Sequence, residues 1–248
     1  DGEIIAAAQE ERFSRRKHDP RFPRQAINYC LEEAFVEPEE LDAVAFYDNP
    51  LLGVDRVLKS LLHVAPRGQE LWLSAARSTL GVKLFAEQHI QETLKRKVPV
   101  VFAEHHVSHA SSAFYPSPFS EAIILTADGV GEWATTTVAI GRENKIFMEK
   151  EIQFPHSLGL LYSAFTYHAG FKVNSGEYKL MGLAPYGTSI YSNIIKDHLI
   201  DIKDDGSFRL NMDYFDFATG LKMTNQKFDK LFKNKPRKPE TEKISNFH

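Results

Sequence analysis

Cysteine is almost absent from this sequence: Cys30 is the only one in 248 residues. One cysteine cannot form a disulfide within the chain, and the lack of cysteine elsewhere argues against a closed structural zinc site. Cys30 falls in a pattern typical of an amphipathic helix, which predicts a small buried side chain. Such sparing use of cysteine is typical of a reducing compartment, so we expect a cytoplasmic protein.

Long apolar runs and an excess of one charge are missing as well. No run approaches the roughly 18 to 20 residues that a membrane-spanning helix needs, and no basic and then apolar leader opens the sequence. The formal net charge is −3, which gives no electrostatic reason for a nucleic-acid partner. We therefore expect no membrane and no nucleic-acid partner, and a chain long enough for one large α/β domain or two compact units.

The hydrophobic pattern of the first half predicts alternating strands and helices. Residues 4–8 are expected as a short buried strand, and the turn at residues 1–3 implies a partner strand before the sequence begins. A helix should follow Pro23, where the missing N–H of proline costs nothing. Further strands are expected at 42–47 and 98–103, with three helical segments between 51 and 97.

Two prolines, Pro116 and Pro118, end the helix expected from about His106 and suggest a boundary between two lobes. Beyond them the pattern predicts an antiparallel meander, in which Thr136, Val138 and Ile140 share one face. Ser157 should cap the next helix. The remaining elements are meander strands at 122–127, 134–140 and 145–153, a short helix at 190–200 and a hairpin-like stretch at 206–217. The proposed division is a first lobe at 1–118, the beginning of a second lobe at 119–232 and a charged, linker-like segment at 233–248, after which the chain looks cut.

A metal site is the strongest functional hypothesis from the residues alone. His105 and His109 stand four apart, so on a helix both imidazoles lie on one face and can reach one ion. Asp128 directly follows an apolar strand, and a carboxylate at a strand end is a usual third ligand. Two surface histidines also fall at this spacing by chance, so the pair alone leaves both interpretations open. His106 points about 100° away on a helix and is expected as a hydrogen-bonding neighbour.

Two glycine-rich segments have a structural and a functional interpretation. Gly129 and Gly131 could form only a tight turn, or they could let a phosphate approach the backbone amides. The segment 173–187 could be an ordinary connection between helices, or it could place backbone amides and one lysine beside a ligand. The sequence leaves both pairs of alternatives open.

A basic segment follows the first expected strand. Residues 9–19 contain five basic and three acidic side chains, which is typical of a solvated loop. The alternative is that basic side chains such as Arg12 and Lys17 gather on an anionic substrate, for example a phosphate.

Five segments together resemble one known family, the NodU/CmcH-type carbamoyltransferases. The segments occur in the order of the family and cover residues 1 to about 190, and the last of them is the most specific. They read AAAQEERFSRRKH at 6–18, EHHVSHA at 104–110, LTADGVG at 125–131, SLGLLYS at 157–163 and GEYKLMGLAPYG at 176–187.

The resemblance implies a fold and a chemistry. The expected fold is α/β, an actin/sugar-kinase-like arrangement of two ribonuclease-H-like lobes, here incomplete. In such proteins the histidine pair and the aspartate of the Asp-Gly turn hold iron or a similar divalent metal, which implies ligands at His105, His109 and Asp128. The family uses ATP and carbamoyl phosphate to form carbamoyl-adenylate and passes the carbamoyl group to a hydroxyl of a sugar or natural product.

Other roles carried over by the resemblance concern the substrates. Arg12 and Lys17 would meet the phosphate or carbamoyl end as catalytic residues. The glycines and the lysine of the two glycine-rich segments would line the nucleotide side, namely Gly129, Gly131, Gly176, Lys179 and Gly182. The expected partners are a small-molecule acceptor and a nucleotide, and the oligomeric state stays open, with a homodimer as one option.

The sequence also departs from the family. It lacks the opening Gly-x-x-His-Asp segment, the rest of the second lobe and the C-terminal YrdC-like domain, so we expect that the chain by itself does not catalyse the full reaction. Two alternatives to a carbamoyltransferase are a non-catalytic nucleotide-binding module of the same fold and a sugar-kinase-like phosphotransferase. The histidine pair argues against both, because neither needs two such ligands.

Overall fold

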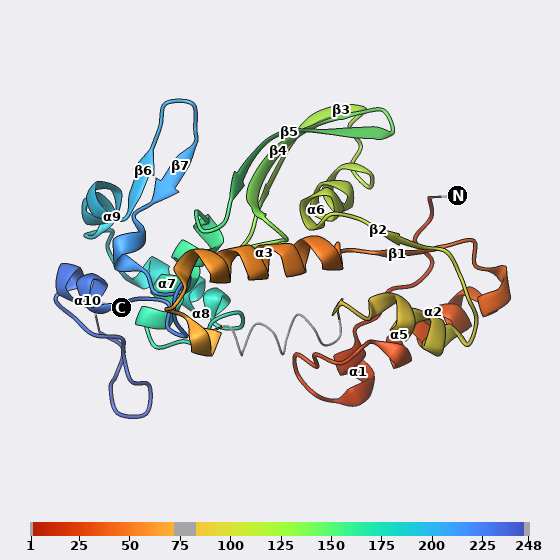
Figure 1. Cartoon of the computed structure of the whole chain (residues 1–248), viewed down its shortest axis with the longest axis horizontal. Coiled ribbons are helices and arrows are strands. Elements are labelled where there is room, and N and C mark those ends of the chain that lie inside the picture. The colour runs from red at the N-terminus through yellow and green to blue at the C-terminus, as the bar shows by residue number, and fades with distance from the viewer. Residues whose placement is uncertain (1, 72–82, 246–248) are drawn as a thin grey trace.

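The structure, a computed structural model, describes residues 2–71 and 83–245, and this part of the chain is mixed α/β (Figure 1). The α-helices are α1 (Glu10–Ser14), α2 (Arg24–Ala34), α3 (Pro50–Val64), α5 (Ala86–Leu94), α6 (His105–Phe114), α7 (Leu158–His168), α8 (Glu177–Leu183), α9 (Ser192–His198) and α10 (Gln226–Phe232). The strands are β1 (Val44–Phe46), β2 (Val100–Phe102), β3 (Glu121–Ala127), β4 (Ala134–Arg142), β5 (Lys145–Gln153), β6 (Ile200–Ile202) and β7 (Phe208–Leu210). Among the described residues no helix is long and apolar enough to cross a membrane.

A short parallel pair of strands organises the first part of the chain. β1 and β2 are in register from Val44 opposite Val100 to Phe46 opposite Phe102. Both strands therefore end at the same edge, where their following loops begin. Helices α2 and α5 cover the pair through one apolar cluster centred on Ile90, Leu94 and Val98.

A three-stranded antiparallel sheet, in the order β3-β4-β5, lies at one edge of the molecule (Figure 1). Helix α6 covers one face of it (Figure 1), and the contact is built from Ala110 and Phe114 of the helix with Ile124 and Ala139 of the sheet. The small side chains of Ala110 and Ala139 let the helix lie close to the strands. Apolar side chains occupy the opposite face, where Ile123 and Leu125 are largely exposed.

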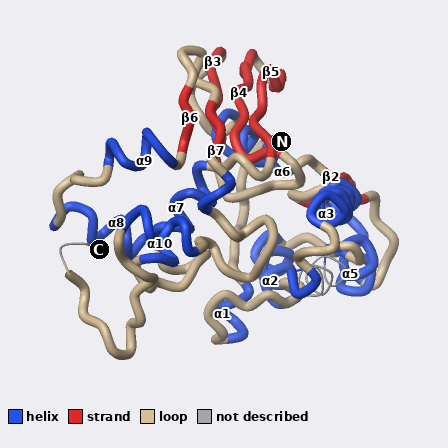
Figure 2. The backbone as a smooth tube through the Cα atoms, turned by 60° about the vertical axis from the view of Figure 1, so that its left-hand side comes forward, coloured by secondary structure: helices blue, strands red, loops and turns tan. Residues whose placement is uncertain are grey.

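The C-terminal part of the described chain has an apolar cluster of its own. Helices α7, α9 and α10 pack there with the β6-β7 hairpin, and the largest fully buried side chain is Phe228. Figure 2 shows this group beside the three-stranded sheet. Ser157 caps α7 as predicted, because its side chain accepts a hydrogen bond from the Leu160 amide at 3.0 Å.

Most of the predicted elements are confirmed, among them the helix after Pro23, the two strands now called β1 and β2, and the meander. One prediction is wrong: residues 4–8 form no strand, and Ile4 and Ile5 are 80% and 59% exposed. A strand exists through hydrogen bonds to a neighbouring strand, and within residues 2–71 and 83–245 no strand pairs with this segment. Of the three helical segments predicted between 51 and 97, the part at 72–82 lies outside the described residues.

One detail of the predicted second half differs from the structure. The hairpin is made of β6 and β7, so its first strand begins at Ile200 instead of beyond residue 206. The turn at residues 203–207, closed by the hydrogen bond from the Lys203 amide to the Ser207 carbonyl, sets this register. The division at residue 118 stays a prediction, although α6 precedes it and packs on the sheet that follows it.

Candidate metal centre

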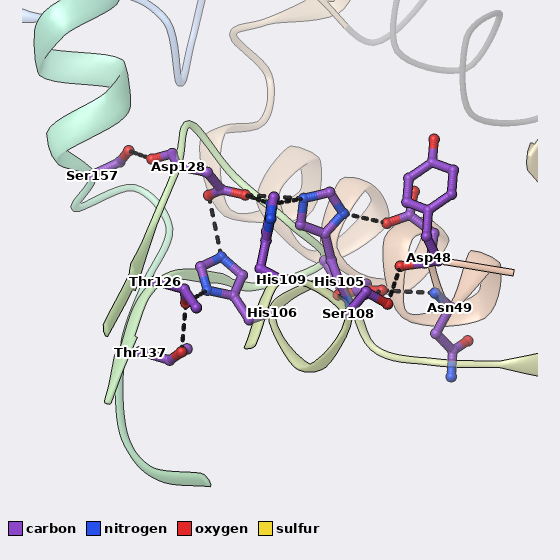
Figure 3. A network of polar contacts seen from close by, with 12 residues as sticks. Asp48, Asn49, His105, His106, Ser108, His109, Thr126, Asp128, Thr137 and Ser157 are labelled. Atoms are coloured by element: carbon purple, nitrogen blue, oxygen red, sulfur yellow. Dashed lines mark hydrogen bonds and ion pairs between the residues drawn. The ribbon is translucent and has the colours of Figure 1, made fainter. Parts of the chain in front are cut away.

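The two histidines and the aspartate of the predicted site meet at one end of the three-stranded sheet. His105 is the first residue of α6 and His109 lies one turn later on the same face. Asp128 directly follows β3, the strand on which α6 packs. Packing of the helix on the sheet therefore brings together side chains that are 19 to 23 positions apart, and Figure 3 shows all three pointing toward one another.

The distances among the three side chains fit one metal ion. Nε2 of His105 lies 3.0 Å from Nε2 of His109 and 3.1 Å from Oδ2 of Asp128, and Nε2 of His109 lies 3.6 Å from the same Oδ2. Two ligand atoms that each lie about 2.1 Å from one ion are about 3.0 to 3.4 Å from each other when the ligand–metal–ligand angle is between the octahedral and the tetrahedral value. Two imidazoles and a carboxylate suit a divalent first-row metal and leave positions open for substrate oxygens. In the described part of the chain this is the one group of three or more such residues that converges.

His105 and Asp128 form an ion pair within this group. The hydrogen bond to Asp128, followed by the one to Asp48, raises the pKa of His105 to about 9. Burial raises the pKa of Asp128, but hydrogen bonds from His105 and His106 outweigh it and lower that pKa to about 2. Burial and the nearby charge of His105 lower the pKa of His109. A metal would replace the proton between His105 and Asp128.

His106 is a hydrogen-bonding neighbour, as its position on the helix predicts. Its side chain is 3% exposed, and Nε2 lies 3.2 Å from Oδ1 of Asp128, the carboxylate oxygen that faces away from His109. Its Nδ1 lies 2.6 Å from Oγ1 of Thr126, which lies 2.6 Å from Oγ1 of Thr137. When the Thr137 hydroxyl donates to Thr126 and the Thr126 hydroxyl donates to Nδ1 of His106, the ring proton of His106 is on Nε2 and is donated to Asp128. This chain of hydrogen bonds fixes the orientation of the aspartate (Figure 3).

Glu132, a buried carboxylate in the turn after Asp128, connects the starts of two helices. Its Oε1 accepts hydrogen bonds from the backbone amides of Asn49, at 2.7 Å, and His105, at 3.0 Å, and its Oε2 accepts a second one from His105 at 2.9 Å. Asn49 is the N-cap of α3 and His105 opens α6. A carboxylate is favourable at both places because helix N-termini carry unpaired N–H groups and a partial positive charge.

Glycine allows the close packing of this turn. A Cβ at Gly131 would lie 2.9 Å from the Cβ of His105, so the turn can approach α6 only with glycine there. Its amide already donates to the Ala134 carbonyl, which favours the structural interpretation of this glycine over a phosphate contact. A Cβ at Gly159, in the first turn of α7, would lie 2.2 Å from the carbonyl oxygen of Asp128. A Cβ added at Gly129 would have one atom within 4 Å, in the Leu160 side chain at 3.9 Å, so packing does not require glycine there.

The second glycine-rich segment folds largely as a helix. Gly176 is the N-cap of α8, and its amide donates to Glu177, which also accepts from Ser163. Lys179 and Gly182 lie on this helix and are exposed. No hydrogen bond or ion pair among the described residues joins the three predicted nucleotide-binding residues Gly176, Lys179 and Gly182 to the metal centre, and their role stays a prediction.

The two predicted catalytic cations lie away from the metal centre. Arg12 is in α1 and Lys17 follows it, and both are exposed. Figures 1 and 2 both place α1 on the opposite side of the molecule from the β3-β4-β5 sheet. The structure therefore groups His105, His109 and Asp128 but does not add Arg12 or Lys17 to them, and the catalytic role of these cations stays a prediction.

Three residues of the site were not predicted from the sequence: Asp48, Glu132 and Gly159. Asp48 lies in the loop after β1 and is 5% exposed, and its Oδ1 lies 2.6 Å from Nδ1 of His105. The rule that pointed to Asp128, a carboxylate just beyond a strand, applies equally to Asp48. Nothing in the spacing of Glu132 or Gly159 indicates their contacts, since both depend on how the helices meet the turn.

Comparison with known proteins gives one family and several relatives. The family model described as "Carbamoyltransferase N-terminus" matches residues 1–247. An uncharacterised protein of Synechocystis is 54% identical over 97% of this chain, and the nodulation protein NolNO of Sinorhizobium fredii is 35% identical over 86% of it. The nodulation protein NolO of Bradyrhizobium diazoefficiens is 33% identical over 44% of the chain. The matched regions make up 40%, 30% and 20% of these relatives, so the chain spans less than half of their length.

Proposed function

Because this chain belongs to the family of carbamoyltransferase N-termini, we propose that the protein containing it transfers a carbamoyl group to a hydroxyl of a sugar or another natural product. The observation that carries the proposal is the family match over residues 1–247, together with the convergence of His105, His109 and Asp128 within that match. A carbamoyl-transfer enzyme needs a site that orients a small charged group, and this is the one converging group of possible metal ligands in the described residues.

The proposed reaction has two stages. In the first, water releases inorganic phosphate from carbamoyl phosphate and leaves carbamate, whose oxygen bonds to the α-phosphorus of ATP while pyrophosphate leaves, which gives carbamoyl-adenylate. In the second, the acceptor hydroxyl oxygen bonds to the carbamoyl carbon, the bond from that carbon to the adenylate oxygen breaks, AMP leaves with the electron pair and the hydroxyl proton is released. Orientation of the reacting groups and exclusion of water would favour transfer over hydrolysis.

The candidate metal centre would serve the second stage. His105, His109 and Asp128 would hold a divalent metal, with iron as the first choice, through two nitrogen atoms and one oxygen. Such an ion supplies Lewis-acid polarisation of a substrate oxygen. His106 fixes the carboxylate of Asp128 from behind through Oδ1, which leaves Oδ2 for the ion.

The rest of the proposal concerns the whole protein. An actin/sugar-kinase-like fold of two lobes, with a nucleotide and an acceptor bound between them, is consistent with the mixed α/β architecture and with the parallel pair β1-β2. Gly176, Lys179 and Gly182 are the residues we assign to the nucleotide, and Arg12 and Lys17 to the phosphate or carbamoyl group. Location in the cytoplasm is part of the same proposal.

One assay of the full-length protein tests this function. The protein is incubated with ATP, carbamoyl phosphate and a panel of hydroxylated acceptors, and the products are analysed by mass spectrometry. We expect inorganic phosphate, pyrophosphate, AMP and an acceptor heavier by one carbamoyl group. A protein that forms neither carbamoyl-adenylate nor any carbamoylated product, although folded and loaded with metal, would refute the proposal.

A further inference from the structure

Asp48 is a buried carboxylate that contacts the metal-centre residue His105 but is not among the predicted ligands. It is 5% exposed, and one of its oxygens faces the ring of His105 on the side opposite the candidate metal position. We propose that Asp48 is the positioning residue of the metal centre, holding His105 in the tautomer and orientation that present Nε2 to the ion. This inference rests on the proposed metal-dependent function and adds a residue to it.

The fold accounts for the meeting of these two side chains, which are 57 positions apart. β1 and β2 are parallel and in register, so their carboxyl ends lie at one edge. Asp48 comes two residues after the end of β1, and His105 three residues after the end of β2. The pairing of β1 with β2 therefore places Asp48 and His105 close enough to form a hydrogen bond.

The two ring nitrogens of His105 have separate partners. Nδ1 lies 2.6 Å from Oδ1 of Asp48, whereas Nε2 faces His109 and Asp128 at 3.0 and 3.1 Å. An imidazole that donates Nδ1–H to a carboxylate must offer the lone pair of Nε2 to a metal, because a neutral ring carries only one proton. Hydrogen bonding of this kind also makes the ligating nitrogen more basic.

The backbone on both sides of this hydrogen bond is fixed as well. Glu132 accepts hydrogen bonds from the amide of Asn49, which follows Asp48, and from the amide of His105 itself. Lys83 forms an ion pair with the other oxygen of Asp48. Oδ1 therefore stays directed at His105, as Figure 3 shows. Asp48 can therefore orient the ring without being free to turn toward the metal.

A titration of the full-length protein with Zn²⁺ tests the inference. Zn²⁺ serves as probe because it is diamagnetic and accepts imidazole and carboxylate ligands. Asp48→Asn should lower the Zn²⁺ affinity about 10- to 100-fold, the usual effect of losing such a partner. Lys83→Met breaks the ion pair but keeps the hydrogen bond, so most of the affinity should remain. Asp42→Asn, at the exposed start of the same strand region, is the matched control and should match the unchanged protein.

Nitrogen-15 NMR of the Zn²⁺-loaded protein supplies a second readout that needs no variant. We expect His105 to carry a hydrogen-bonded proton on Nδ1 and the metal on Nε2. A metal on Nδ1, or an Asp48→Asn protein that is folded and binds Zn²⁺ as tightly as the unchanged protein, would overturn the role of Asp48 while leaving the metal centre in place. Failure of the unchanged protein to bind Zn²⁺ would instead overturn the metal centre, and this inference with it.

Discussion

The Nε2 atoms of His105 and His109 face each other at 3.0 Å across one turn of α6. Two such nitrogens at this distance share either a proton or a metal ion, since their lone pairs would otherwise point at each other. Asp128 completes the triangle from the neighbouring strand end.

Loss of either histidine should abolish metal binding. His105→Ala and His109→Ala each remove one of three donors, and we expect metal affinity to fall by more than about 100-fold, beyond the usual effect of losing an outer-shell partner. His63→Ala is the matched control, because His63 is exposed on α3 and belongs to no such group among the described residues. Metal content by mass spectrometry and a Zn²⁺ titration measure the effect. Retention of the metal by both ligand variants would show that it binds elsewhere.

The metal-free protein should become less stable as the pH rises from 6.5 through about 9. The hydrogen bond to Asp128, followed by the one to Asp48, raises the pKa of His105 from 6.5 to about 9. The folded state therefore binds more protons than the unfolded state in this window, and the free energy of unfolding falls as the pH rises. Asp128 has the opposite sign: its pKa falls from 3.8 to about 2, so its contribution is lost as the pH drops through this range.

Urea unfolding of the chelator-treated protein across both pH windows checks this. His105→Gln should flatten the alkaline arm and leave the unfolding free energy nearly constant between 6.5 and 9. The same proton must leave when a metal binds, so the apparent metal affinity should rise with pH in the alkaline window. An alkaline arm unchanged by His105→Gln would assign the titration to another group.

Gly159→Ala should destabilise the fold strongly. The new methyl group would lie 2.2 Å from the Asp128 carbonyl oxygen, and backbone cannot move aside as a flexible side chain can. We expect a loss of about 3 kcal/mol, the upper end of the range for overpacking. Gly182→Ala is the matched control: its Cβ has no atom within 4 Å, and alanine in this helix should add about 0.5 to 1 kcal/mol. Unfolding curves of equal midpoint for the two variants would contradict the close approach.

Thr126→Val should weaken both the fold and the metal centre. Valine keeps the shape but removes the hydroxyl beside Nδ1 of His106, and a buried polar atom left without a partner costs about 1 to 3 kcal/mol. With His106 no longer held, Asp128 loses its fixed orientation and metal affinity should fall. Thr136→Val, on the opposite face of β4, is the control because its buried hydroxyl has no hydrogen-bond partner. We expect this control to be neutral or slightly stabilising in the same unfolding and titration measurements.

Local patterns predicted much of this architecture. The spacing of His105 and His109 indicated a shared helix face, and the break after an apolar run located Asp128 at the end of β3. Alternation in β4 was also clear, but it could not tell which face is buried. The structure buries Thr135 and Thr137 and leaves the side with Val138 and Ile140 more exposed. Helix α6 packs on the buried face, where the Thr137 hydroxyl continues the hydrogen-bond chain from His106 through Thr126.

Contacts between distant segments could not be predicted in this way. The hydrogen bond between Asp48 and His105 depends on the parallel pairing of β1 with β2, which no local pattern encodes. The segment at 4–8 has the composition of a strand and yet forms none, since composition supplies no pairing partner.

The carboxylate of Glu132 couples the hydrogen exchange of two backbone amides that are distant in the sequence. The N–H groups of Asn49 and His105, which are 56 positions apart, both end on this side chain. Each amide must break its hydrogen bond to Glu132 before it can exchange its proton with solvent, and we expect this to happen when the turn that carries both Glu132 and Asp128 opens. Their hydrogen-exchange rates should therefore be similar, and a metal bound at Asp128 should slow both together, which makes these two amides reporters of site occupancy.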